Sequence, residues 1–194
     1  MTDQPAARVA IIGKGADALQ STLQLESSPL ETADAAIFIV SAADGIVRAD
    51  NDLWEIARER YIPSLVVISD LNASLDLDFE DMSAIASKML DQVATPYLVL
   101  HDESSAPVAL IDLTTMAIRD YSTGSPVERS ADPEHKEIVA DFAEEYVELL
   151  EASGEDGFTQ GLLFPALPWV PSNHLGEVEI KSYLSSLNIV PRAS

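Results

Sequence analysis

The sequence predicts a three-layer α/β domain built on a doubly wound, mostly parallel sheet, with a ββα insertion. Three observations support this fold class: short strands alternate with helical segments, the strands are apolar on both faces, and this alternation stops after residue 105. Strands that are covered by helices on both sides read as continuous apolar runs. We therefore expect an α/β core at residues 1–105 and 156–194, and an insertion at residues 106–155.

The core strands are expected where short runs of β-branched and aliphatic residues stand between turn residues, at 8–12, 35–41, 64–69, 96–100 and 162–166. Apolar residues at helical spacing predict helices at 16–25, 50–61, 79–90 and 177–187. Trp54 falls on the inner side of its helix and is expected in the core. Trp169 stands in the rigid loop Pro168-Trp169-Val170-Pro171 and is also expected in the core, the alternative being an exposed aromatic at a protein interface. Because crossovers between parallel strands are right-handed as a rule, these units should form an open, doubly wound sheet.

The insertion begins with two short strands in succession, 107–113 and 115–121, which predict a hairpin. A polar loop at 122–132 leads to Asp132-Pro133, a favourable helix start, and a long helix at 133–151. The apolar stripe of this helix, expected to face inward, consists of Ile138, Val139, Phe142, Tyr146, Leu149 and Leu150. Its other face is almost entirely acidic.

Composition narrows the function classes. The chain of 194 residues has 33 Asp and Glu against 11 Lys and Arg, a net charge of -22. Such a surface repels phosphate backbones and anionic lipid, so a basic protein partner is favoured over nucleic acid or a membrane. There is no cysteine, the three histidines are far apart in sequence, and no metal site is expected. Residues 1–7 lack a signal-peptide pattern and no apolar run is long enough to cross a bilayer, so a cytoplasmic location is expected.

A glycine-rich turn follows the first strand. The run from Gly13 to Ala18 matches G-x-G-x-x-A between a strand and a helix, which is the pattern of a dinucleotide-binding turn, and Asp44 follows the second strand. A tight strand-to-helix turn also needs glycine without any ligand. Binding of NAD or another nucleotide through Gly13, Lys14 and Gly15 therefore stands as an alternative.

Two blocks of the chain resemble the elongation factor G family of translational GTPases. Residues 32–72 are similar to the family's segment of a buried strand, an Asp-Gly turn, a helix that contains a Trp, a Pro, and a strand that ends in Asn-Lys-Met-Asp. Residues 107–151 are similar to the family's G′ insertion, with Ala109-Leu110-Ile111-Asp112-Leu113 and then an acidic helix. The resemblance implies a G domain with a G′ insertion and a shortened N-terminal half.

Several departures from the family pattern imply that GTP is neither bound nor hydrolysed. A phosphate-binding loop needs a Lys followed by Ser or Thr, yet Lys14 is followed by Gly15, and Arg8 stands where the loop should begin. The interval from Lys14 to Ala35 has room for one short helix, so the family's first switch, its hairpin and its Asp-Thr-Pro-Gly-His segment are missing.

The base-reading segment also departs from the family. Ser69-Asp70-Leu71-Asn72 replaces Asn-Lys-Met-Asp, and the amide of Asn72 cannot accept both guanine N–H groups as a carboxylate would. The resemblance thus implies that the vestigial nucleotide site would consist of Gly13, Lys14, Gly15, Asp44, Ser69, Asp70 and Asn72.

The sequence predicts a pseudo-GTPase-like protein-interaction module without catalytic residues. No bound cofactor is expected, and GTP, GDP and NAD are the nucleotides to test. In the resembled family the ribosomal stalk protein docks on the G′ insertion, which implies a partner-binding role for the acidic face that contains Glu137, Asp141, Glu144, Glu145 and Glu148.

Overall fold

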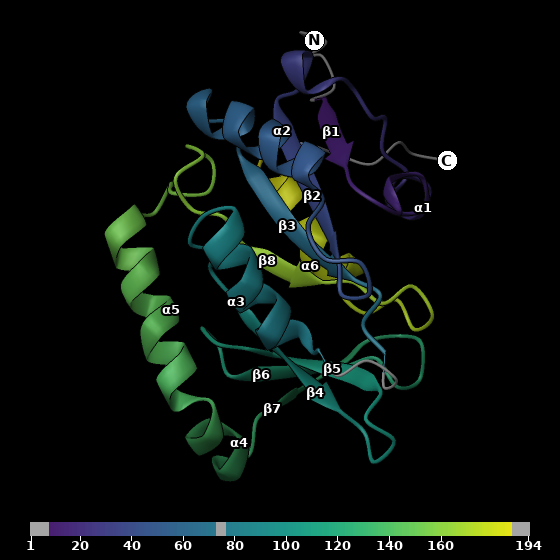
Figure 1. Ribbon diagram of the computed structural model, residues 1–194. Coiled ribbons are helices and arrows are strands. Elements are labelled where there is room, and N and C mark those ends of the chain that lie inside the picture. Colours follow the sequence, from purple (N-terminus) through teal and green to yellow (C-terminus); the bar gives the residue numbers. More distant parts are fainter. Residues whose placement is uncertain (1–7, 73–76, 188–194) are drawn as a thin grey trace, which may run out of the picture.

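The computed structural model describes residues 8–72 and 77–187, and the expectations for residues 1–7 and 188–194 lie outside this part. Two sheets organise the described chain. One is a parallel sheet with helices on both faces, and the other is an antiparallel sheet flanked by a long helix (Figure 1).

The parallel sheet has the order β1-β2-β3-β8. Its strands are β1 (Val9–Ile12), β2 (Ala35–Ser41), β3 (Ser64–Ser69) and β8 (Ala166–Pro168). Every residue of β2 and β3 is buried, as expected of central strands with cover on both sides.

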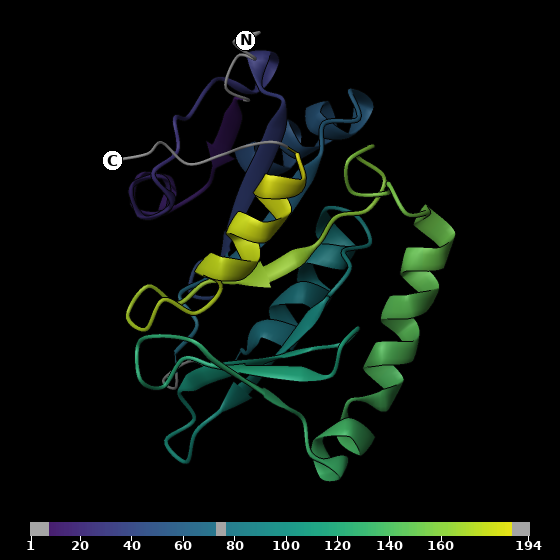
Figure 2. The ribbon, with the colours of Figure 1, turned by 180° about the vertical axis from the view of Figure 1, so that it is seen from behind.

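Helices cover both faces of this sheet. On one face α1 (Ala16–Leu23) and α6 (Glu177–Ser186) pack on the side chains of Val9, Ile37 and Val67. On the other face α2 (Arg48–Glu59) and α3 (Phe79–Met89) pack on Ala10, Phe38 and Val66. Figure 2 shows α6 over the rear face of the sheet, opposite α2 and α3. The predicted three-layer α/β fold with a mostly parallel sheet is confirmed, and Trp54 and Trp169 are buried in it.

One crossover in this sheet has an unusual hand. The steps from β1 to β2 and from β2 to β3 run in the same direction across the sheet, yet α1 and α2 lie on opposite faces. Two such crossovers must have opposite hands, and the β2-α2-β3 unit has the usual right hand in Figure 1. The β1-α1-β2 unit is therefore left-handed, an arrangement found in only about 2% of parallel crossovers. The expectation of right-handed crossovers is wrong at this step.

The antiparallel sheet has the order β4-β5-β6-β7. Its strands are β4 (Tyr97–His101), β5 (Pro107–Asp112), β6 (Ala117–Asp120) and β7 (Val127–Ser130). The predicted hairpin is confirmed as β5 and β6. The placement of β4 in the parallel sheet is wrong, because it pairs with β5 from Tyr97 opposite Asp112. Strand β7 was not predicted, because its side chains are all exposed and give no apolar pattern.

The predicted long helix is divided at Val139 into α4 (Pro133–Ile138) and α5 (Ala140–Ser153). Asp132 caps the start through its side chain, which accepts a hydrogen bond from the backbone N–H of His135 at 2.9 Å. The predicted inner stripe is only partly correct. Val139 and Tyr146 are buried, but Ile138 and Phe142 are 67% and 44% exposed.

A buried ion pair joins the second sheet to the helix layer of the first. The carboxylate of Glu179 on α6 is fully buried and pairs with the guanidinium of Arg119 on β6. The hydroxyl of Tyr121 donates to the same carboxylate at 2.7 Å.

Within residues 8–72 and 77–187, no helix combines the length and apolar character needed to cross a membrane.

Candidate functional site

A cavity of about 540 Å³ opens at the carboxyl edge of the parallel sheet. The turn before α1 contributes Lys14 and Gly15, the last residue of β3 and the loop after it contribute Ser69 to Asn72, and the segment after β8 contributes Trp169 to Ser172. Ligands of open α/β sheets bind at this edge, outside the carboxyl ends of the strands. The fold thus brings together most of the residues that the sequence assigned to a vestigial nucleotide site.

The turn from β1 to α1 needs its two glycines for backbone reasons. Gly13 has φ +110, and a Cβ atom there would lie 2.4 Å from the carbonyl oxygen of Ile39 on β2. Gly15 has φ +91 and caps the start of α1 in the left-handed region. Both conformations favour glycine strongly. The turn is accounted for without any ligand.

Lys14 does not point into the cavity as a free cation. Its Nζ atom forms an ion pair with Oδ2 of Asp44, which follows β2. The hydroxyl of Ser41 then connects two carboxylates, because it lies 3.2 Å from Oδ2 of Asp44 and donates to Oδ2 of Asp70 at 2.6 Å. Since Asp70 also acts on Lys14, this cluster combines one ammonium with two carboxylates.

The electrostatics of the pair follow from this geometry. The hydrogen bond from Lys14, and then Coulomb attraction to it, lower the pKa of Asp44 below its ordinary value. The same hydrogen bond and attraction raise the pKa of Lys14. Among the described residues that line the cavity, Lys14 is the one basic side chain. At neutral pH the cluster therefore has a net negative charge.

The side chain of Asn72 forms a hydrogen bond within its own loop. The amide Nδ2 of Asn72 donates to the backbone carbonyl of Asp70 at 2.9 Å. Asp70 itself has a left-handed backbone, with φ +59. An amide used in this way stabilises the loop after β3.

Trp169 forms an aromatic wall of this cavity, and the sequence analysis did not include it among the site residues. Trp169 is 3% exposed, and its Cζ3 atom would lie 3.9 Å from a Cβ atom on Gly15. It packs beside the turn where α1 begins, and Val170 and Pro171 continue the wall. The signal was the rigid run Pro168-Trp169-Val170-Pro171, which predicted a buried aromatic but not its place beside the turn.

The proposed partner-binding acids lie elsewhere, on α4 and α5. All five are exposed, and none lines the cavity beside Lys14: Glu137, Asp141, Glu144, Glu145 and Glu148. The exposed side chains of Ile138 and Phe142 lie on the same helices. Figure 1 shows α5 on the outside of the molecule, away from the carboxyl edge of the parallel sheet.

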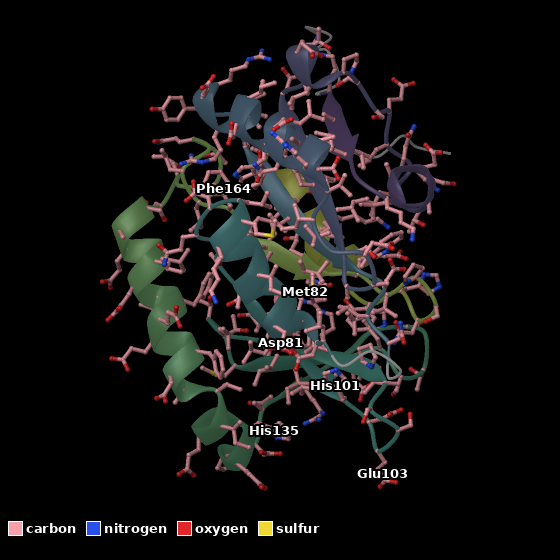
Figure 3. All side chains as sticks on the ribbon, viewed as in Figure 1. Asp81, Met82, His101, Glu103, His135 and Phe164 are labelled. Carbon is pink, nitrogen blue, oxygen red and sulfur yellow. The ribbon has the colours of Figure 1, made fainter. Side chains whose placement is uncertain are left out.

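The described residues contain no cluster of side chains suited to bind a metal ion. In residues 8–72 and 77–187, no three or more His, Asp and Glu side chains are grouped so as to hold a metal ion. Figure 3 shows His101 on the antiparallel sheet and His135 on α4, on different elements.

Comparisons with known proteins agree with the resemblance. The chain is 22% identical over 175 residues to an elongation factor G-like protein of Mycobacterium tuberculosis, in the strains CDC 1551 and H37Rv. This similarity covers 78% of the present chain and 24% of that protein. A crystal structure from Thermus thermophilus has the same fold with a TM-score of 0.70 and 23% identity, over 84% of this chain and 27% of the other.

No protein-family model matches the chain. The chain spans about a quarter of the length of these proteins, 24% of the curated relative and 27% of the Thermus chain. The chain is thus similar in sequence to part of an elongation factor G-like protein and shares its fold with part of the Thermus structure.

Proposed function

We propose that this chain is a protein-interaction module related to the G domain of elongation factor G, and that it does not hydrolyse GTP. The observation that carries the proposal is the ion pair between Lys14 and Asp44. In this ion pair the ammonium group of Lys14 binds Asp44, whereas in a GTPase of this family the corresponding ammonium group would bind the nucleotide phosphates.

A triphosphate would meet unfavourable electrostatics at this edge of the sheet. To bind it, Lys14 would have to exchange Asp44 for phosphate while the carboxylates of Asp44 and Asp70 stayed close by. No second Lys or Arg among the described lining residues would compensate. Gly15, which follows Lys14 just before α1, has no hydroxyl for magnesium, which the family's Ser or Thr supplies at this position.

The left-handed β1-α1-β2 crossover supports the same proposal. In a doubly wound sheet the covering helices change faces where the strand order reverses. Here the face changes between α1 and α2 while the order β1-β2-β3 continues in one direction. This is the arrangement expected if strands on the far side of β1, with the switch segment that leads to them, are missing between α1 and β2.

The nucleotide part is tested by isothermal titration of the purified chain with GTP, GDP, ATP and NAD, each with magnesium. We expect no binding in the micromolar range. Tight binding of a guanine nucleotide would contradict the proposal. Binding of NAD alone would favour the alternative, a dinucleotide site at the turn of Gly13, Lys14 and Gly15.

A variant pair sharpens this titration. Asp44→Asn together with Asp70→Asn removes both carboxylates around Lys14, while Asp52→Asn with Glu55→Gln removes the same charge from the exposed face of α2. If the carboxylates alone exclude phosphate, the first variant gains GTP affinity and the second does not. Because the hydroxyl for magnesium and the switch segment are also missing, we expect no gain in either.

The partner is proposed to bind the acidic face of α4 and α5. Exposed acids share these helices with the exposed apolar side chains of Ile138 and Phe142, a combination that suits a basic, partly apolar protein surface. By the family resemblance, the first candidate is the ribosomal stalk protein.

Charge reversal tests this surface. We expect Glu137→Lys, Asp141→Lys and Glu144→Lys together to abolish binding of purified stalk protein in a titration. The matched control is Asp52→Lys, Glu55→Lys and Glu59→Lys on α2, three exposed acids on another helix. Equal binding by the first variant and the wild type, or no binding by the wild type, would refute this partner.

A further inference from the structure

A second cavity, of about 520 Å³, lies between α5, the loop of residues 154–163 and α6. Its lining includes Leu150 near the end of α5, Leu163 ahead of β8 and Ser186 in the last turn of α6. It is thus on the amino side of β8, whereas the Lys14 cavity lies at the carboxyl edge. Its size falls in the range of small-molecule sites, about 300–1,000 Å³.

Aromatic side chains from four separate segments line this cavity: Tyr97 from β4, Tyr146 from α5, Phe158 from the loop and Tyr183 from α6. The rings of Phe158 and Tyr183 meet edge to face, with centroids 5.1 Å apart and an interplanar angle of 82°. The phenols of Tyr146 and Tyr183 influence each other's pKa. Aromatic faces are electron-rich and attract cations within about 6 Å of the ring centroid.

The charged side chains that line this cavity are all acidic. Glu155 and Asp156 belong to the lining and are exposed to solvent, and the described lining residues include no Lys, Arg or His. Lys181, the basic residue of α6, lies 3.9 Å from Glu177 and does not line the cavity. Carboxylates beside aromatic rings disfavour an anion and favour a cation.

The other residues that line the cavity suit a ligand with an alkyl chain and N–H donors. Leu150 and Leu163 supply apolar contact, while Thr159, Ser182 and Ser186 supply hydroxyl acceptors. Burial raises the pKa of Tyr146 and of Tyr183, so both phenols stay protonated at neutral pH. Their oxygens can accept hydrogen bonds without adding charge.

We propose that the cavity between α5 and α6 binds an organic cation of the alkylammonium class. The ammonium group is held by the rings of Tyr146, Phe158 and Tyr183 together with the carboxylates of Glu155 and Asp156. The alkyl chain lies along Leu150 and Leu163. This site is separate from the Lys14 cavity and does not depend on the function proposed above.

The first test is an NMR titration of ¹⁵N-labelled protein with n-pentylammonium and with 1-pentanol, its neutral counterpart. We expect saturable shifts of the amides around Gly154 and Phe158 with the amine, and binding at least about tenfold weaker with the alcohol. Equal affinity for the two probes would overturn the proposal, because the cavity would then be an apolar pocket only. The absence of saturable shifts would overturn it as well.

Variants separate the cavity from the overall acidity of the chain. Glu155→Gln with Asp156→Asn should weaken amine binding about five- to tenfold, whereas Asp52→Asn with Glu55→Gln on α2 should leave it unchanged. Equal weakening by both pairs would overturn the proposal in favour of diffuse charge attraction. Ser186→Trp fills the cavity from an exposed position and should abolish binding, with the unfolding midpoint as a check on the fold.

Two further probes identify the source of the ammonium group. Spermidine represents a free polyamine, and Nα-acetyl-lysine methylamide represents a side chain of a protein partner. Tighter, Glu155-dependent binding of spermidine supports the proposal with a free polyamine as ligand. Tighter binding of the lysine derivative supports it with a protein side chain.

Discussion

The hydroxyl of Tyr121, the residue after β6, donates to Oε2 of Glu179 on α6 at 2.7 Å, inside the protein. Arg119 of β6 pairs with the other oxygen of this carboxylate, Oε1. One buried carboxylate therefore connects the antiparallel sheet to the helix that covers the parallel sheet. A buried charge held by an Arg and a hydroxyl is stable only while its partners stay in place.

Arg119 supplies a matched comparison between a buried and an exposed carboxylate. It also pairs with Glu128, whose side chain is 61% exposed, at 3.1 Å. Glu179→Ala should lower the free energy of unfolding by about 3–5 kcal/mol, because it leaves the buried hydroxyl of Tyr121 without its acceptor and Arg119 with the exposed Glu128 alone. Glu128→Ala should cost less than about 1 kcal/mol. Urea unfolding measures both, and equal losses would contradict the connecting role of Glu179.

Gly13 should tolerate no larger residue. In Gly13→Ala the new Cβ would lie 2.4 Å from the carbonyl oxygen of Ile39, at φ +110. We expect a loss of more than about 2 kcal/mol in unfolding free energy, as backbone strain adds to the clash. Gly124→Ala is the control, since its φ is also positive, +82, but its Cβ would meet nothing within 4 Å. A similar small loss of unfolding free energy in both variants would show that the backbone of Gly13 does not pack tightly against Ile39 on β2.

The exposure of Phe142 is directly measurable. Phe142→Ala removes a side chain that is 44% exposed and should cost less than about 1 kcal/mol. Tyr146→Ala, one turn later and 6% exposed, should cost about 3–5 kcal/mol. If Phe142→Ala were as damaging as Tyr146→Ala in thermal or urea unfolding, α5 would have to pack on a different face.

Glu80 makes stability depend on pH in the opposite sense to a paired acid. Burial raises its pKa above the ordinary 4.5, although the N–H of Val99 donates to its Oε1 at 3.2 Å. The folded chain therefore holds this proton more strongly than the unfolded chain. The contribution of Glu80 to stability falls as pH rises from about 4.5 through the raised pKa.

Glu80→Gln isolates this effect, because the amide oxygen can still accept from Val99. Relative to the wild type, the variant should gain stability between pH 4 and pH 7 in urea unfolding. Glu55→Gln, at an exposed position on α2, serves as the control and should show a flat difference over the same interval. A flat difference for Glu80→Gln as well would mean that its carboxylate is solvated in the folded state.

Local pattern determined most elements of this protein, but not β7 or the division of the long helix at Val139. β2 and β3 were predictable because every residue of an apolar run is buried in a central strand. The helix start at Asp132 was predictable because a side-chain cap is a local interaction. The meeting of Lys14, Ser69 and Asp70 followed from the same reading, since the ends of parallel strands share one edge of the sheet.

Tertiary contacts decided what local pattern leaves open. Strand β4 could have joined either sheet, and its pairing with β5 is a long-range choice. Ile138 and Phe142 match the helical period of Tyr146, but α5 touches the core over a narrower face than its apolar stripe. A Glu in sequence reads as a solvated residue, and only the approach of Arg119 and Tyr121 from another sheet makes burial of Glu179 favourable. Likewise, the sequence shows that Lys14 is charged, but its ion pair with Asp44 forms only because β1 packs beside β2.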